Sequence, residues 1–245
     1  IAIAIGGPGA VFWMWLTAFL GMSSAFVESS LAQLFKVRDQ QNQQFRGGPA
    51  YYITQGLKQK WLGVVFAISL ILTYGFVFNA VQANAISGAT SHAWGWDQAN
   101  IVLAGGFEVS WVGLALVLMT ALFIFGGIER IAKLAVSFVP FMALLYLMVA
   151  LYIAMLNFDS LPAMFQLIFS KAFEFEAAAG GFFGAMISMA MMMGIKRGLF
   201  SNEAGMGSAP NAAAASDVKH PVNQGLVQML GVFVDTFVVC SCTAI

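Results

Sequence analysis

A run of small and polar residues in this sequence lies between two strongly apolar blocks. Residues 194–216 read GIKRGLFSNEAGMGSAPNAAAAS, so two cations, a carboxylate and several small polar side chains interrupt a run of hydrophobic residues. Ionisable groups inside such a run are costly and usually face a cavity or a charged partner. This stretch is therefore the first candidate for a binding site.

The same stretch has the composition that a break in a membrane helix requires. Non-helical backbone is tolerated in hydrocarbon only where protein encloses it or where it lines a wet cavity. At a break, one half-helix ends with free carbonyls, which attract a cation, and the next begins with free amides, which attract a carboxylate. A zwitterionic substrate with a coupling cation fits these two features. The residues that favour the break are Gly194, Gly198, Gly205 and Gly207, with Ser201 and Asn202 between them.

Helix packing is the alternative explanation for these glycines. The segments 180–184 and 194–198 each begin and end with glycine, a spacing that lets two helices approach closely. Packing explains the first segment, but it does not explain why Lys196, Arg197 and the polar residues 201–203 occur together. If the break lies near the membrane surface, those charges only mark an interface.

A second polar constellation, TYGFVFNAVQANAIS, lies deep in another apolar block. At about 100° per residue, Tyr74, Phe78 and Gln82 share one helix face. Asn79 lies at the edge of that face, while Asn84 points nearly opposite. An aromatic and amide face suits a small amino acid better than a bulk ion path. Hydrogen bonds between helices explain Asn79 equally well and Asn84 better.

Two acidic residues lie within other apolar blocks. Asp235, followed by Thr236, is the lone carboxylate of the last block. An aspartate at such a position indicates a cation site or a proton relay, and a structural hydrogen bond is the alternative. Glu28, with Ser29 and Ser30 after it, lies nearer the end of its block, where its side chain can extend to the interface. We expect a structural role for Glu28.

The sequence contains no indication of catalysis or nucleic-acid binding. HExxH, GxSxG and Walker motifs are absent, and so is a basic stripe with interleaved aromatic residues. His92 and His220 are isolated, and Cys240 and Cys242 have neither a disulfide nor a metal spacing. We expect the cysteines to be buried thiols, and we expect no enzyme and no metal beyond a coupling cation.

The elements that must position these residues are membrane-spanning helices. Of the 245 residues, 60% are hydrophobic and 9% are charged, and the apolar residues come in blocks of about twenty. We expect six crossings, at 11–35, 61–90, 109–127, 132–156, 178–215 and 221–245. A continuous helix over the fifth block would be about 57 Å long, nearly twice the hydrocarbon thickness, so we expect it to be broken.

Lysine and arginine give the orientation of these crossings. With Ile1 outside, the outer connections hold only Lys171, and the other connecting cations lie inside. We therefore assign the connection 36–60 to the cytoplasm. Its segment FRGGPAYYITQGL predicts a short helix that begins at Pro49 and lies in the membrane interface.

Three stretches together resemble a known transporter family. GGPGAVFWMW at 6–15, FRGGPAYYITQGL at 45–57 and GLFSNEAGMGSAPNAAAAS at 198–216 are similar to the sodium:alanine symporters, the alanine or glycine:cation symporter family. The third stretch is close to the signature of that family. The resemblance extends from Ile1 to about Thr236.

The resemblance implies an all-α, polytopic membrane protein with a leucine-transporter-type fold, which has two inverted repeats of five helices. On that plan, residues 1–245 are a single transmembrane domain that contains the second to seventh helices, and 198–205 belongs to the discontinuous sixth helix. We expect an internal piece of a longer protein, because the first and eighth helices of the family would lie outside it. A monomer in the bacterial or archaeal cytoplasmic membrane is the expected state.

The function that the resemblance implies is sodium-coupled uptake of alanine or glycine by alternating access. Two alternatives remain: a proton-coupled transporter of the same fold, with Asp235 or Glu203 as the proton carrier, and a channel or scaffold. Polar residues confined to one level of two or three helices disfavour conduction. We expect the substrate to contact Phe200, Ser201, Asn202, Gly205, Phe78 and Gln82, and the sodium ion to contact Ser201, Asp235 and Thr236.

Overall fold

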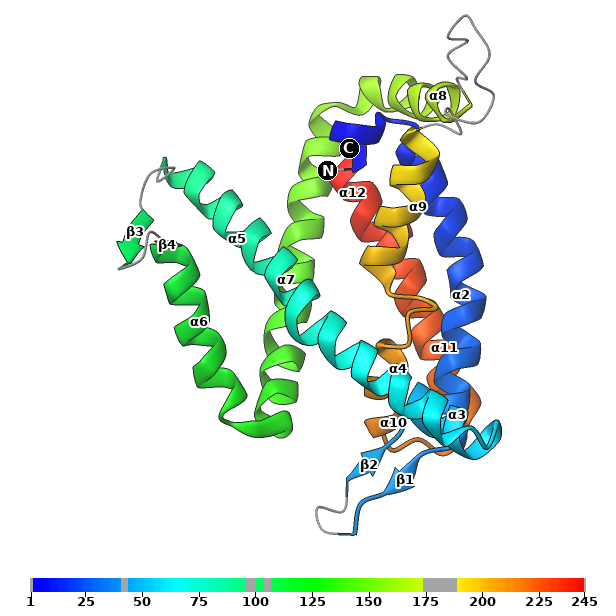
Figure 1. The fold of residues 1–245 in the computed structure, drawn as a ribbon. Coiled ribbons are helices and arrows are strands. Elements are labelled where there is room, and N and C mark those ends of the chain that lie inside the picture. Colours follow the sequence, from blue (N-terminus) through cyan, green and yellow to red (C-terminus); the bar gives the residue numbers. More distant parts are fainter. Residues whose placement is uncertain (1, 41–43, 96–99, 104–106, 174–188, 245) are drawn as a thin grey trace, which may run out of the picture. The chain divides into compact units, whose positions relative to one another are not determined.

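The computed structural model of this chain is largely helical, and it describes residues 2–40, 44–95, 100–103, 107–173 and 189–244 (Figure 1). The chain divides into two compact units. The first contains Ile1–Ala67 and Tyr146–Ile245, and the second contains Ile68–Leu145. The polar stretch 194–216 belongs to the first unit.

Four helices among the described residues are long and apolar enough to cross a membrane, namely Ala10–Leu34, Lys60–Trp94, Arg130–Leu156 and Pro221–Ala244. They confirm the first, second, fourth and sixth expected crossings. The third expected crossing is a shorter apolar helix, Trp111–Ile124. The fifth is broken as expected, and its segment 178–188 lies outside the described residues.

The long helices of the first unit mostly coincide with the apolar blocks of the sequence. In chain order they are α1 (Ala2–Gly6), α2 (Ala10–Leu34), α3 (Pro49–Gly56), α4 (Lys60–Leu72, which extends into the second unit), the end of α7 (Gly127–Leu156), the 3₁₀ turn η2 (Phe158–Ser160), α8 (Leu161–Ala172), α9 (Met189–Asn202), α10 (Ala209–Ala215), α11 (Pro221–Phe233), the π-helix η3 (Val234–Cys240) and α12 (Ser241–Ala244).

Helix α2 is the centre of this unit, because it packs against both α9 and α11 (Figure 1). Small side chains let these helices approach closely. Ala18 and Ala25 of α2 form a buried cluster with Ala204, which follows α9, and with Val232 of α11. The buried apolar face of α2 therefore holds the polar stretch against the rest of the unit.

The expected interfacial helix is present as α3, and Pro49 occupies its first turn. A proline at this position loses no helical hydrogen bond, since the first amides of a helix have no partner in it. Two strands before it, β1 (Val37–Arg38) and β2 (Phe45–Arg46), form a short antiparallel hairpin that we did not predict. Asp39 and Arg46 form an ion pair at 2.6 Å there. The chain is therefore mostly helical rather than all-α, since short antiparallel hairpins join some of its helices.

The second unit contains the rest of the long helix that begins at Lys60. A π-helix, η1 (Thr73–Phe78), leads into α5 (Asn79–Trp94) without a break. The strands β3 (Asn100–Leu103) and β4 (Phe107–Ser110) form an antiparallel hairpin before α6 (Trp111–Ile124). Ser110 caps α6 by accepting a hydrogen bond from the Gly113 amide.

Candidate functional site

The break that the sequence predicts lies between α9 and α10. Helix α9 ends at Asn202 and α10 begins at Ala209, so residues 203–208 are not helical. Gly205 and Gly207 adopt the left-handed region, with φ of 81° and 78°. This region is costly for residues that carry a Cβ atom, and glycine reaches it freely. Glu203 adopts it as well, with φ of 53°.

The break begins after Ser201 and Asn202, which we expected to lie within it. Phe200, Ser201 and Asn202 are in the last turn of α9 rather than in irregular backbone. They are therefore side chains on a helix end, and the carbonyls of that turn form the negative end of its dipole.

The expectation that Gly194 and Gly198 contribute to the break is wrong, because both lie in the regular part of α9 and pack against α2. A Cβ atom on Gly194 would lie 2.6 Å from the Cβ atom of Trp13, and even closer to the Ala10 carbonyl. At Gly198 it would lie 3.4 Å from the Cβ atom of Thr17. Close packing, the alternative explanation, accounts for this pair.

The structure brings together the three residues that we expected to bind a cation. The hydroxyl of Ser201 donates to Oδ2 of Asp235 at 2.7 Å, and the hydroxyl of Thr236 donates to the same oxygen at 3.2 Å. Thr236 is fully buried, whereas the Ser201 side chain is exposed. Asp235 and Thr236 lie in η3, and π-helical turns often occur at functional sites. The result is a carboxylate with two hydroxyls beside the negative end of α9.

Asn202 connects this cluster to the break. Its Nδ2 atom donates to Oγ1 of Thr236 at 3.3 Å, and its Oδ1 atom accepts from the Ala204 amide at 3.1 Å. The side chain is 9% exposed. Both ends of the Asn202 amide are thus engaged within the protein, so the side chain shapes the turn that follows α9.

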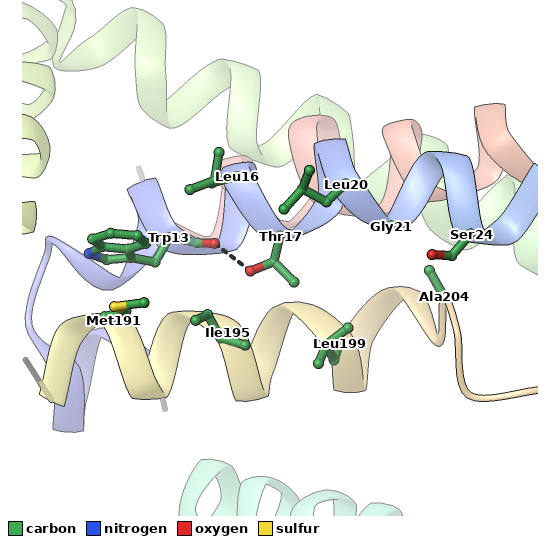
Figure 2. A pocket seen from close by; sticks show the side chains of 10 residues that line it. All are labelled: Trp13, Leu16, Thr17, Leu20, Gly21, Ser24, Met191, Ile195, Leu199 and Ala204. Atoms are coloured by element: carbon green, nitrogen blue, oxygen red, sulfur yellow. Dashed lines mark hydrogen bonds between the residues drawn. The ribbon is translucent and has the colours of Figure 1, made fainter. Parts of the chain in front are cut away.

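An apolar cavity lies beside the break, between α2 and α9 (Figure 2). Its volume is about 370 Å³, which is within the usual range for small-molecule sites. The Thr17 hydroxyl in its wall donates to the Trp13 carbonyl at 2.8 Å. None of the six expected substrate contacts lines this cavity. The residues that line it are Trp13, Leu16, Thr17, Leu20, Gly21, Ser24, Met191, Ile195, Leu199 and Ala204.

Phe78 and Gln82, the other expected substrate contacts, belong to the second unit. The rings of Tyr74 and Phe78 stack with centroids 4.4 Å apart, which confirms that these two residues share a face. Phe78 is 6% exposed, whereas Gln82 is exposed. Asn79 donates to the Gly75 carbonyl of its own helix at 3.3 Å, so this contact is not the interhelical bond that we considered.

Sequence reasoning missed the part of Glu28 in this region. The backbone amides of Gly205 and Gly207 form hydrogen bonds with its carboxylate, so the side chain turns to the break rather than to the interface. Tyr52 of α3 is close to the same charge. Burial, and then the negative charge of Glu28, raises the pKa of Tyr52 from its ordinary 10.0 to about 12. The signal in the sequence was Gly21, Ser24 and Glu28, which share one face of a helix.

The remaining titratable residues add no further site in the described part of the chain. Cys240 and Cys242 are free thiols, as expected from their spacing, although both are only partly buried. Cys240 lies 3.3 Å from the Ser201 hydroxyl. Among the described residues, no three His, Cys, Asp or Glu side chains are grouped as a metal site.

Comparison with known proteins places these features in a family. The model of the sodium:alanine symporter family matches residues 1–245. The chain is 62% identical over 244 residues to an uncharacterized transporter of Haemophilus influenzae, covering 100% of this chain and 48% of the relative. It is 50% identical over 244 residues to the probable sodium/glutamine symporter GlnT of Bacillus subtilis, with coverage of 100% and 48%.

A third relative is archaeal. The chain is 42% identical over 248 residues to the sodium/alanine symporter AgcS of Methanococcus maripaludis, with coverage of 100% and 51%. The chain thus spans about half the length of the curated relatives it matches. These relatives are transporters and not enzymes, and the four long apolar helices agree with a multi-pass membrane protein. The chain belongs to the sodium:alanine symporter family.

Proposed function

We propose that the full-length protein couples the uptake of a small neutral amino acid, alanine or glycine, to sodium entry across the cytoplasmic membrane. The observation that carries this proposal is the cluster of Ser201, Asp235 and Thr236 beside the end of a broken helix. A leucine-transporter-type fold that works by alternating access as a monomer is part of the proposal. Family membership supports sodium coupling and an amino-acid substrate.

The cluster has the chemistry of a sodium site. All three side chains offer oxygen atoms, which hard cations prefer, and Asp235 supplies a negative charge. The last carbonyls of α9 add the negative end of a helix dipole, since Ser201 lies in that last turn. A cation held here would contact both η3 and α9, so its binding would stabilise one arrangement of the broken helix.

The substrate is proposed to bind at the same end of α9, near Phe200, Ser201, Asn202 and Gly205. Phe78 and Gln82, which belong to the second unit, stay substrate contacts predicted from the sequence. The relatives are named for alanine in one case and for glutamine in another, so membership alone leaves the substrate open. Small residues at the break support a small substrate. Ser201, Gly205 and Gln82 are the exposed residues of this set.

The test is alanine uptake into liposomes that contain the full-length protein. Wild-type uptake should require an inward sodium gradient and stop when potassium replaces sodium. Asp235→Asn should raise the sodium concentration for half-maximal uptake by roughly tenfold to a hundredfold, because charged hydrogen-bonding groups contribute about 1.5–3 kcal/mol. Ser201→Ala should have a smaller effect in the same direction.

The matched control is Asp159→Asn, which makes the same chemical change at an exposed residue of η2. Its sodium dependence should equal that of the wild type. Unchanged sodium dependence in Asp235→Asn would remove the cluster from the ion site. Wild-type uptake that ignores sodium would refute the proposed coupling.

Proton coupling is the second candidate, because a carboxylate inside a membrane span can carry a proton as well as bind a cation. Asp235 is the better carrier of the two that we considered, since it lies inside the long apolar helix Pro221–Ala244, whereas Glu203 lies outside the four long apolar helices of the described residues. Uptake that follows an inward pH gradient without sodium, and that Asp235→Asn abolishes, would establish this alternative.

A further inference from the structure

The carboxylate of Glu28 occupies backbone amides that we expected to be free. In a broken helix, exposed amides attract carboxylates because they have no partner in the helix and carry a partial positive charge. Here Gly205 and Gly207 both direct their amides to Glu28. Glu28 of α2 therefore already supplies the negative charge that these amides attract.

Successive residues on one face of α2 lie against successive residues of the break. A Cβ atom on Gly21 would lie 3.0 Å from that of Ala204, and one on Gly205 would lie 3.9 Å from that of Ser24. Glu28 comes one turn later and contacts the amides beyond. Because residues spaced three and four apart share a helix face, this register fixes the break along about two turns of α2.

The carbonyl side of the break is also held. The Nδ2 atom of Asn211 donates to the Gly207 carbonyl at 2.8 Å and to the Ser208 carbonyl at 3.3 Å. Asn211 is itself in close contact with Gly48, which has a φ of 113° and immediately precedes α3. Pro49 and Phe66 lie against Gly207, so a Cβ atom there would be 2.9 Å from Cγ of Pro49. The break is thus enclosed by α2, α3 and α10.

We propose that Glu28 is a positioning residue for transport, which holds the non-helical residues 203–208 in place through the amides of Gly205 and Gly207. The inference rests on the proposed function for its transport consequence. It also deepens that function, because the carboxylate of the amino-acid substrate does not bind these two amides.

The direct test is hydrogen exchange of the full-length protein in nanodiscs, read by mass spectrometry on peptides that cover 203–208. Glu28→Gln removes the charge and keeps the size of the side chain. Exchange of the break should become roughly tenfold to a hundredfold faster, since hydrogen bonds to charged groups are the stronger ones. Peptides from the middle of α11 should keep their wild-type exchange, and Asp159→Asn should change neither region.

Glu28→Asp is the second variant, because it keeps the charge and shortens the side chain by one methylene. It should accelerate exchange of the break less than Glu28→Gln does. If Glu28→Gln accelerates exchange throughout the protein, it has destabilised the whole fold. The peptides of 203–208 and of α11 are then compared in Glu28→Asp instead. Wild-type protection of the break in a folded Glu28→Gln or Glu28→Asp protein would overturn the proposal.

Uptake then separates positioning from simple stability. Glu28→Gln should raise the KM for alanine by roughly tenfold at saturating sodium, with a smaller change in kcat per folded transporter, and Glu28→Asp should restore part of the loss. A lower kcat with an unchanged KM would refute the positioning role. If the wild type shows no sodium-dependent uptake, the proposed function fails while the exchange experiment still decides what Glu28 does.

Discussion

Two pairs of glycines lie close together in the same polar stretch, and they have opposite uses. Gly194 and Gly198 are inside α9, where they remove side chains that would collide with α2. Gly205 and Gly207 lie beyond the helix end, where they allow a left-handed backbone. The first pair brings two helices together, and the second pair lets the chain leave its helix.

The difference between the pairs comes from their neighbours. Ala10 and Trp13 of α2 cover Gly194 in a helical register. By contrast, Asn202 bonds to the Ala204 amide and Glu28 bonds to the amides of Gly205 and Gly207, so the backbone groups that leave the helix find other partners. A membrane helix breaks where its unpaired groups are satisfied, and glycine alone does not specify that place.

The second pair should show the largest effect of a single methyl group. Gly207→Ala should lower the free energy of unfolding by about 1–2 kcal/mol because of the left-handed conformation. Contact of the new methyl group with Pro49 and Phe66 should lower it further, by about 1–3 kcal/mol. Gly205→Ala should have only the cost of the left-handed conformation, because the atom nearest to its new Cβ atom, Cβ of Ser24, would be 3.9 Å away. The measurement is the apparent Tm of the purified full-length protein, followed by size-exclusion chromatography after heating.

These two variants are controls for each other, because both place alanine at a positive φ. The fall in Tm should be greater for Gly207→Ala than for Gly205→Ala. Equal or reversed falls would show that Pro49 of α3 and Phe66 of α4 do not close the break as described.

The first pair should respond to packing alone. Gly194→Ala should destabilise the protein by about 1–3 kcal/mol, because its methyl group meets the backbone of Ala10 and the side chain of Trp13. Gly198→Ala should be neutral or stabilising, since its contacts begin at 3.4 Å and alanine favours a helix over glycine by about 1 kcal/mol. The same Tm measurement compares the two. A larger loss at Gly198 would contradict the packing of α9 on α2.

Composition and periodicity were sufficient for the long helices and for the position of the polar stretch. Apolar blocks of about twenty residues predict membrane helices because the hydrocarbon thickness sets their length. Ser201, Asp235 and Thr236 were expected to contact one sodium ion, and the structure joins them through Oδ2 of Asp235. Their use in ion binding stays a prediction.

The contacts of Glu28 and the use of each glycine could not be predicted, because both depend on which helix faces the break. A snorkelling glutamate and one that binds backbone amides have the same sequence context. The helix α6 (Trp111–Ile124) is another example, since its apolar block does not reveal that β4 takes its first residues. Pairing or packing with another segment decided each of these cases.

Two asparagines sharpen the comparison between the broken helix and the continuous one. Asn202→Ala should cost about 1–2 kcal/mol, because it removes the bonds to Thr236 and to the Ala204 amide inside the protein. It should also reduce uptake by loosening the turn after α9. Asn79→Ala should change the apparent Tm little, since its exposed side chain bonds only to its own helix among the contacts described. If Asn202→Ala has wild-type stability and uptake, then the turn does not depend on this amide.

The smallest effect concerns Tyr52, which tests whether α3 encloses the charged side of the break. Its pKa is raised to about 12 by burial and by the negative charge of Glu28, so the folded protein keeps the phenol neutral. The unfolded chain releases this proton near its ordinary pKa of 10.0. The contribution of Tyr52 to stability is therefore complete below pH 10 and is lost as the pH rises towards 12.

Tyr52→Phe should remove this part of the alkaline loss, and the measurement is the apparent Tm between pH 9 and pH 12. Tyr51→Phe is the matched control, because it deletes a phenol hydroxyl from the same helix. The Tm of Tyr52→Phe should fall less steeply with pH than that of the wild type or of Tyr51→Phe. Parallel curves for all three proteins would mean that Tyr52 is accessible to water, and α3 would then not close the break beside Glu28.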